Sequence, residues 1–273
     1  MNLSGKTCLV TGANSGLGFE ITKLLATHGA ETVMLCINEE VGERAILEIK
    51  RAVPGTAIEL MICDLSSMDS IQSFINAFLK RKTKLDILFN NAAIMKKKRT
   101  VTEDGFEMMF QVNYLAPFIL MTSFRDILKK GSSPQILNNG RPSDRLRLDM
   151  DDLQFIKKYS MYHSFFKTKL CLLFTSLEYS RRYGNDGIST FMADPGPFKS
   201  NLVKEVPLAG WFKNLFSSTV DKAAENILYV LTSEIEKNGK VFKEKKEYPL
   251  IEYWKDKNVG EQLWSITESL IKG

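Results

Sequence analysis

Histidine is scarce in this chain of 273 residues, and its four cysteines show no CxxC spacing. Because only His28 and His163 are present and no cysteines are paired at ligand spacing, the sequence predicts no metal site. The cysteines lie inside apolar runs, at Cys8, Cys36, Cys63 and Cys171. Such placement is typical of reduced, buried thiols, so we expect a cytoplasmic protein.

Long hydrophobic runs are also missing, since no apolar stretch reaches the roughly 18 residues that a membrane-spanning helix needs. A strand-like run begins by Thr7, so we expect no cleavable signal, and any membrane contact would be peripheral. No linker, low-complexity tract or fixed-period repeat divides the chain. We therefore expect one domain over residues 1–273, with a cofactor half of about 1–140 and a substrate half of about 141–273.

A strong charge of either sign is absent, because 37 basic and 32 acidic residues leave a net charge of +5. The basic residues gather locally in "KKKR" at 96–99 and "KEKK" at 243–246, which we interpret as solvated loops. An anionic membrane surface or an acidic partner is the alternative for these runs. No basic repeat is interleaved with aromatic residues, so we do not expect nucleic-acid binding.

What the sequence does contain is an alternation of short apolar strands and amphipathic helices. Strands are predicted at 7–11, 31–36, 57–63, 85–90 and 135–138, and helices at about 16–27, 40–51, 68–80 and, as a pair, 102–128. This alternation predicts an α/β Rossmann fold, with a doubly wound and mostly parallel sheet that we expect to have seven strands. Ligands of such sheets lie at the carboxyl ends of the strands.

The turn between the first strand and the first helix is rich in glycine, in the stretch "TGANSGLG" at 11–18. Glycine at this place lets backbone amides approach a pyrophosphate at the positive end of the helix. A purely structural turn is the alternative. The residues expected to form the phosphate cradle are Gly12, Asn14, Ser15, Gly16, Leu17 and Gly18.

Further motifs follow along the chain, namely "CDLSS" at 63–67, "NNAA" at 90–93, "TEDGFEMMFQVNYLAPFIL" at 102–120, "DDLQF" at 151–155 and "DPGPFKSNL" at 194–202. Their order resembles the short-chain dehydrogenase/reductase family, and most of all its retinol-dehydrogenase-like branch. The resemblance implies a bound dinucleotide, NADP or NAD. The residues that it assigns to this cofactor outside the cradle are Asp64, Leu65, Asn90, Ala92, Lys169, Pro195 and Gly196.

The resemblance also implies an active site, from which this sequence departs. Asn113 and Lys169 match the asparagine and lysine of the family, but the tyrosine expected four residues before the lysine is Phe165. A phenyl ring cannot exchange a proton with a carbonyl or alcohol oxygen. The serine expected after the fifth strand is replaced by Gly140 and Arg141, although Ser143 would serve if the loop were shifted.

Tyr162 is the candidate for a substitute acid, because it lies three residues before Phe165 near the same helical stripe. The alternative for Tyr162 is packing or solvent exposure. Cofactor preference is also unset: at the end of the second strand, Cys36 and Ile37 stand where the branch has cysteine and arginine. Asn38 would bond to the ribose of either cofactor, and weak binding of both is one outcome.

The segment at 197–218, which covers the substrate in this family, keeps an amphipathic apolar pattern. It fits a lid that packs on its own core, a lipophilic small molecule, a membrane interface, or a protein partner such as a second copy of the chain. Three functions stay open. The favoured one is a non-catalytic, regulatory or assembly subunit; the others are an oxidoreductase that uses Tyr162, and a non-redox isomerase or cyclase that uses Arg141.

Overall fold

Eight strands form one sheet at the centre of the computed structural model, which describes residues 2–140, 143–198 and 219–272. The strand order is β3-β2-β1-β4-β5-β6-β7-β8, and every neighbouring pair is parallel except β7 and β8. The strands are β1 Thr7–Thr11, β2 Glu31–Cys36, β3 Ile58–Ile62, β4 Ile87–Asn90, β5 Gln135–Asn139, β6 Ser189–Asp194, β7 Val241–Lys243 and β8 Lys246–Tyr248. The predicted α/β Rossmann fold is confirmed.

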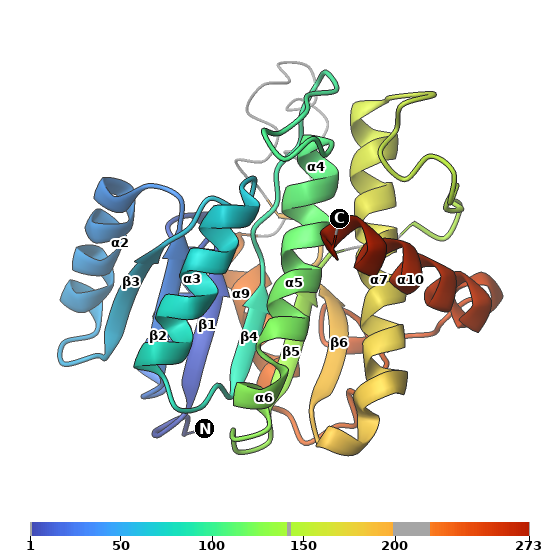
Figure 1. The fold of residues 1–273 in the computed structure, drawn as a ribbon. Helices are drawn as coiled ribbons and strands as arrows, with labels where there is room; N and C mark the ends of the chain where they lie inside the picture. The colour runs from blue at the N-terminus through green and yellow to red at the C-terminus, as the bar shows by residue number, and fades with distance from the viewer. Residues whose placement is uncertain (1, 141–142, 199–218, 273) are drawn as a thin grey trace.

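Helices cover both faces of this sheet, with α3, α5, α7 and α10 in front of it and α9 behind it in the view of Figure 1. Helix α1 packs against α9 on the second face. The helices are α1 Gly16–Thr27, α2 Glu39–Ala52, α3 Met68–Arg81, α4 Met108–Phe110, η1 Gln111–Leu115, α5 Ala116–Ser123, α6 Arg125–Leu128, α7 Met161–Tyr183, η2 Gly184–Asp186, α9 Val220–Thr232, η4 Glu252–Lys255 and α10 Lys257–Lys272.

Alternate residues of the central strands pack into hydrophobic cores on opposite faces of the sheet. In β1, Cys8 and Val10 pack with α1 and α9, whereas Leu9 between them packs with α3 and α5. All five residues of β1 are buried, because a parallel strand between two helical layers has no solvent-facing side. This explains why the strands read as continuous apolar runs in the sequence.

The expectation of seven strands is wrong, because a short hairpin adds an eighth. The "KEKK" run, interpreted as a solvated loop, ends β7 and begins β8 around a two-residue turn in which Glu244 has a φ of 56°. The Lys240 ammonium also bonds to the Glu247 carboxylate at 2.8 Å across the hairpin. This strand could not be predicted from the sequence, because its side chains are polar and mostly exposed and show no apolar alternation.

The predicted helix pair at 102–128 begins later than expected. Residues 102–107 form a turn through Gly105, closed by a bridge between Val101 and Glu107, so that α4 starts only at Met108. The Glu107 carboxylate then caps this helix by accepting from the Phe110 amide at 2.7 Å. Capping by an acidic side chain fixes the start of the helix at the positive end of its dipole.

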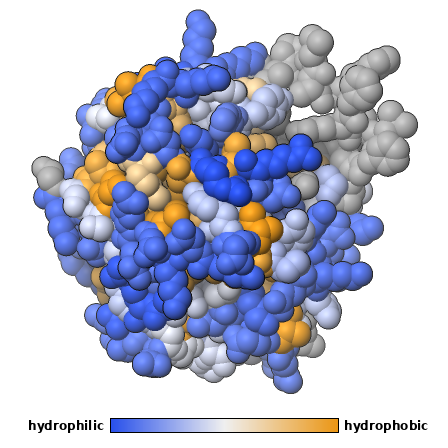
Figure 2. Space-filling model, turned by 90° about the vertical axis from the view of Figure 1, so that its right-hand side faces the viewer, coloured by the Kyte–Doolittle hydropathy of each residue, from blue (hydrophilic) through white to orange (hydrophobic). Residues whose placement is uncertain are grey.

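The surface beside α7 and α10 is largely hydrophilic, with hydrophobic residues in small groups (Figure 2). In the described part of the chain, no helix is both long and apolar enough to cross a bilayer. All four cysteines are free and buried. Burial raises the pKa of the Cys36 and Cys63 thiols to about 11, so both are protonated at neutral pH.

Candidate functional site

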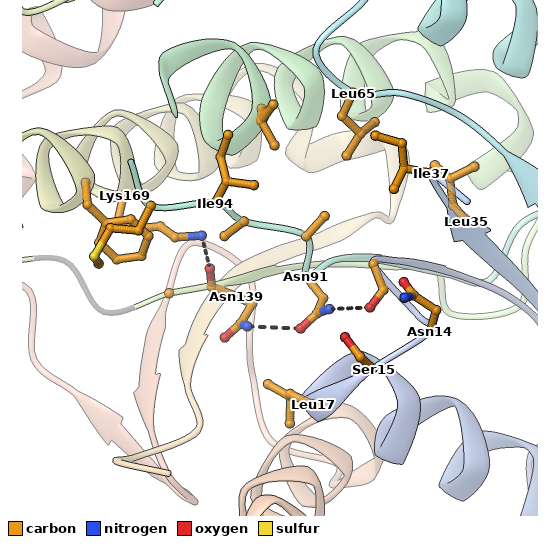
Figure 3. A pocket seen from close by; sticks show the side chains of 18 of the residues that line it. Asn14, Ser15, Leu17, Leu35, Ile37, Leu65, Asn91, Ile94, Asn139 and Lys169 are labelled. Atoms are coloured by element: carbon orange, nitrogen blue, oxygen red, sulfur yellow. Dashed lines mark hydrogen bonds between the residues drawn. The ribbon is translucent and has the colours of Figure 1, made fainter. Parts of the chain in front are cut away.

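A cavity of about 720 Å³ opens at the carboxyl ends of β1 to β6, where the fold class predicts a ligand. Its size lies within the usual range of small-molecule sites. Figure 3 shows Asn14, Ser15 and Ile37 toward one end and Lys169 toward the other, with Asn91 and Asn139 between them. The sequence-predicted residues that line it are Gly12, Asn14, Ser15, Gly16, Leu17, Ile37, Asp64, Leu65, Ala92, Gly140, Phe165, Lys169, Pro195 and Gly196.

The first turn of α1 has the features of a phosphate cradle. Helices α2 and α3 are capped by the side chains of Asn38 and Ser67, whereas Ser15 makes no side-chain cap on α1. The free amides of α1 therefore begin directly at the cavity, at the positive end of the helix. Gly16 has a φ of 55°, and a Cβ built on it would meet nothing within 4 Å, so the space there is open for a ligand.

Gly18 acts differently from the other cradle glycines, because it does not line the cavity. A Cβ on Gly18 would lie 2.3 Å from the carbonyl oxygen of Gly12 and 2.6 Å from Asn91 Nδ2. Glycine is therefore required for α1 to pack closely against the turn that precedes it. The residues present fit a dinucleotide at this end of the cavity.

Two polar residues assigned to the cofactor lie outside the cavity. Asn38 Oδ1 accepts a hydrogen bond from the Val41 amide at 2.9 Å, so this side chain is engaged as the cap of α2. Asn90 is buried in β4, where its Nδ2 donates to Asn138 Oδ1 at 2.8 Å and holds β4 to β5. Because side chains alternate along a strand, the neighbouring Asn91 reaches the cavity instead.

The loops after β3 and β6 hold their lining residues through local bonds. Asp64 Oδ1 accepts from the Ser66 amide at 2.8 Å and from the Ser66 hydroxyl at 2.6 Å, which turns the chain into α3. Asp194 Oδ1 accepts from the Gly196 amide at 3.0 Å, while Asn226 of α9 donates to the Pro195 carbonyl. Both loops are thereby fixed where they border the cavity.

A chain of amide side chains crosses the floor of the cavity (Figure 3). Asn91 Nδ2 donates to the Thr11 carbonyl at 2.8 Å, and Asn139 Nδ2 donates to Asn91 Oδ1 at 3.2 Å. The chain ends at Lys169, whose Nζ donates to the Asn139 carbonyl at 2.9 Å. Asn91 and Asn139 were not among the predicted site residues, although Asn91 directly follows β4 and Asn139 ends β5, and these positions were the signal that could have identified them.

Lys169 and Phe165 lie one turn apart on α7 and face the same cavity. Lys169 is only 3% exposed, and burial lowers the pKa of its ammonium to about 8. Its Nζ lies 5.8 Å from the centre of the Phe165 ring, in cation–π geometry. Phe166 packs edge-on against Phe165, so the surroundings of the amine are aromatic.

Asn113 supports the site from behind without lining it. Its Oδ1 accepts from the Ile94 amide at 2.8 Å, and its Nδ2 donates to the Ile94 carbonyl at 2.9 Å and to Thr168 Oγ1 at 3.3 Å. Asn113 sits in the π-helical segment η1, all of which is buried. Such widened turns occur often at functional sites. Asn113 thus joins the loop after β4 to α7, next to Phe165 and Lys169.

Of the predicted catalytic residues, Tyr162 is not brought to the cavity. Tyr162 is 42% exposed near the start of α7 and does not line the cavity. Arg141 lies outside the described residues, as does the predicted lid beyond Phe198. Phe198 itself borders the cavity beside Gly196.

Comparisons with known proteins agree with this architecture. The model of the short chain dehydrogenase family matches residues 6–140. The WW domain-containing oxidoreductase of Gallus gallus is 32% identical over 258 residues, which cover 88% of this chain and 62% of that protein. Retinol dehydrogenase 13 of Mus musculus is 30% identical over an alignment of 285 residues, covering 98% of this chain and 84% of that protein.

Solved structures share the same fold. An uncharacterized protein from Mycobacterium paratuberculosis superposes with a TM-score of 0.78 at 25% identity, covering 99% of this chain and 95% of that chain. RhlG of Pseudomonas aeruginosa, in an active-site complex with NADP, gives a TM-score of 0.71 at 19% identity, covering 89% and 95%. With the cradle, the parallel sheet and the sequence relatives in agreement, the chain belongs to the short-chain dehydrogenase family.

Proposed function

We propose that this protein binds a dinucleotide but has lost the conventional proton transfer of its family, and that it acts as a regulatory or assembly subunit. One observation carries the proposal: the position on α7 one turn before Lys169 faces the cavity and is occupied by the ring of Phe165. A bound nicotinamide supplies or accepts a hydride, but a carbonyl oxygen at this place would find no phenol to protonate it.

The surrounding residues support this proposal. In the proposed complex Lys169 would bond to the ribose, while its ammonium lies over the ring of Phe165, which carries no hydroxyl. Ser15 carries a hydroxyl but lies at the opposite end of the cavity (Figure 3). Tyr162, the candidate for a substitute acid, does not line the cavity. The chain would thus retain binding and orientation while proton transfer is missing.

For the cofactor itself, we propose a preference for NAD over NADP. Ile37, directly after β2, is 64% exposed and borders the cavity where a cation would be needed to bind a 2′-phosphate. Glu39 and Glu40 follow in the first turn of α2, so the charges nearest to Ile37 along the chain are negative. Among the described lining residues, the only cations are Lys96 and Lys169, on other segments.

We propose a lipophilic small molecule as the second ligand. Beside Lys169 the cavity is lined by apolar side chains, which include Ile94, Met108, Val112 and Phe166. A second cavity of about 360 Å³ shares Phe166 and Asp194 with the first, and its lining mixes apolar residues of β7 and Trp254 with charged ones such as Arg145. The name of the related mouse protein, retinol dehydrogenase 13, also indicates a lipophilic alcohol.

The test combines binding with turnover. Titration with NADH and NADPH, followed by fluorescence, should show saturable binding that is tighter for NADH. A panel of apolar aldehydes and ketones should show negligible turnover by the native chain. The double variant Phe165→Tyr with Arg141→Ser should then raise turnover by at least about 100-fold, because general acid catalysis contributes about 10²–10⁴-fold.

Native turnover well above the uncatalysed rate would contradict the proposal. If the single variant Tyr162→Phe abolished that turnover, the displaced-acid oxidoreductase would be the correct function. Conversion of a ligand without any dinucleotide would instead support the isomerase or cyclase. Phe166→Tyr is the matched control for the double variant, because it adds the same hydroxyl one residue away on α7.

A further inference from the structure

Lys169 is a buried amine at the wall of an apolar chamber, and its placement is tightly defined. The side chain is 3% exposed, and its Nζ bonds to the Asn139 carbonyl. A Cβ built on Gly140 would lie 3.0 Å from Lys169 Cδ, so the lysine stem runs closely over the glycine backbone. Glycine at 140 therefore leaves the stem the space that it occupies along this wall.

The charge state of this amine differs from that of a surface lysine. None of the ion pairs formed by the described residues includes Lys169, and burial lowers the pKa of its ammonium to about 8. Near neutral pH a larger fraction of the Lys169 side chains is therefore neutral than of surface lysines, whose ordinary pKa lies near 10.5. Only the neutral amine has the lone pair that attacks a carbonyl.

We propose that Lys169 captures lipophilic aldehydes as a reversible imine when no dinucleotide occupies the cavity. The Nζ lone pair forms a bond to the aldehyde carbon, and the carbonyl oxygen takes up a proton to give a carbinolamine. This intermediate loses water as the carbon–nitrogen double bond forms. The net change is amine plus aldehyde to imine plus water, so no oxidant, reductant or dinucleotide is consumed.

The wall of the cavity is suited to the product as well as to the reaction. A protonated imine is a cation, and the Phe165 ring lies 5.8 Å from Nζ in a position to stabilise it. The Asn139 carbonyl accepts the hydrogen of that nitrogen at the distance now seen for Lys169. The alkyl or aryl part of the aldehyde would contact Phe166 and Ile94, so an apolar aldehyde is favoured over a small polar one.

Reductive trapping tests this proposal on the full native chain. The protein is incubated at pH 7.5 with cinnamaldehyde and sodium cyanoborohydride, which reduces the imine to a stable secondary amine, and the modified lysines are mapped by mass spectrometry. We expect Lys169 to be labelled at least tenfold more than Lys167, which lies on the same helix but does not line the cavity. With propanal the ratio should fall severalfold, because less apolar surface is buried.

Equal labelling of Lys169 and Lys167 would overturn the proposal, and an equal ratio for the two aldehydes would overturn the ligand class. NADH at a concentration that saturates the chain should lower Lys169 labelling at least fivefold, and no protection at saturation would contradict the shared cavity. The mapping needs no variant. As a control, Lys169→Arg should remove the aldehyde adduct at position 169 and leave the adduct at Lys167 unchanged. If NADH does not bind at all while Lys169 is labelled, the proposed function fails and the covalent capture stands.

Discussion

The two ends of the cavity differ in what defines them. At the α1 end, the site is built from backbone: an uncapped helix start, an open position at Gly16 and a close approach at Gly18. At the α7 end, the site depends on a few side-chain atoms. These are the Lys169 amine and the para carbon of the Phe165 ring, where a tyrosine would carry its hydroxyl. A backbone site resists change where a substitution such as Gly18→Ala disturbs packing, whereas one hydroxyl can be removed with no change of fold. Binding and chemistry can therefore diverge independently.

The largest effect is expected when the backbone end is disturbed. Gly18→Ala places a Cβ 2.3 Å from the Gly12 carbonyl oxygen, so the turn must move. We expect the Kd for NADH to rise at least about 30-fold, or about 2 kcal/mol, in a fluorescence titration. Gly184→Ala is the control, because Gly184 has a helical φ of −57° and a Cβ on it would lie 3.8 Å from Asn238 Nδ2, which is ordinary contact. Unchanged NADH binding by Gly18→Ala would show that the cradle does not depend on this close approach.

An effect of similar size, but with a distinct pH dependence, is expected at the α7 end. The unfolded chain holds the Lys169 proton up to a pKa near 10.5, whereas the folded chain releases it near 8. The buried charge therefore lowers the free energy of unfolding by about 3 kcal/mol below pH 8, and this cost disappears as the pH rises from about 8 to about 10.5.

Lys169→Met removes that charge and also the bond to the Asn139 carbonyl, so the net gain in stability at pH 7 should be about 2 kcal/mol. Urea unfolding at pH 7 and pH 10 measures it, and the gain should be mostly lost at pH 10. Lys167→Met, on the same helix, should change stability little at either pH. A native chain that is more stable than Lys169→Met at pH 7 would contradict the buried-charge argument.

The smallest effect concerns the adenosine side of the cradle. Ile37→Arg supplies the cation that a 2′-phosphate needs, and the Kd for NADPH should fall about tenfold while that for NADH changes little. Leu47→Arg is the matched control, since it also replaces an exposed apolar residue by arginine but lies on α2 away from the cavity. If both variants lowered the Kd for NADPH equally, the effect would come from net charge and not from a specific contact. Native binding that is tighter for NADPH than for NADH would overturn the proposed preference.

Much of the first half of the molecule follows from the sequence. The strand predicted at 31–36 and the helix predicted at 16–27 have the bounds seen in β2 and α1, because apolar runs and helical periodicity directly reflect burial. The glycine-rich turn could also be placed, since its spacing between a strand and a helix is a local property.

Other features depend on contacts that local patterns do not encode. Strand β8 is held by backbone pairing to β7 and has no apolar face to mark it. The π-helical turn around Asn113 reads as ordinary helix, and the bonds that Asn113 makes to the Ile94 backbone join distant parts of the sequence. Asn38 fitted a ribose contact equally well in sequence terms until the structure placed it as the cap of α2. Competition between local capping and ligand binding is settled only in three dimensions.

Helix α7 makes position 165, at one end of the cavity, suitable for protein engineering. It runs over 23 residues between the sheet and α10, with Leu172 and Phe174 fully enclosed, so the spacing between its residues is set by the whole core. A new side chain at Phe165 would inherit that fixed position without any redesign of its support. Different reactive side chains could therefore be introduced at position 165 while the rest of the fold stays the same.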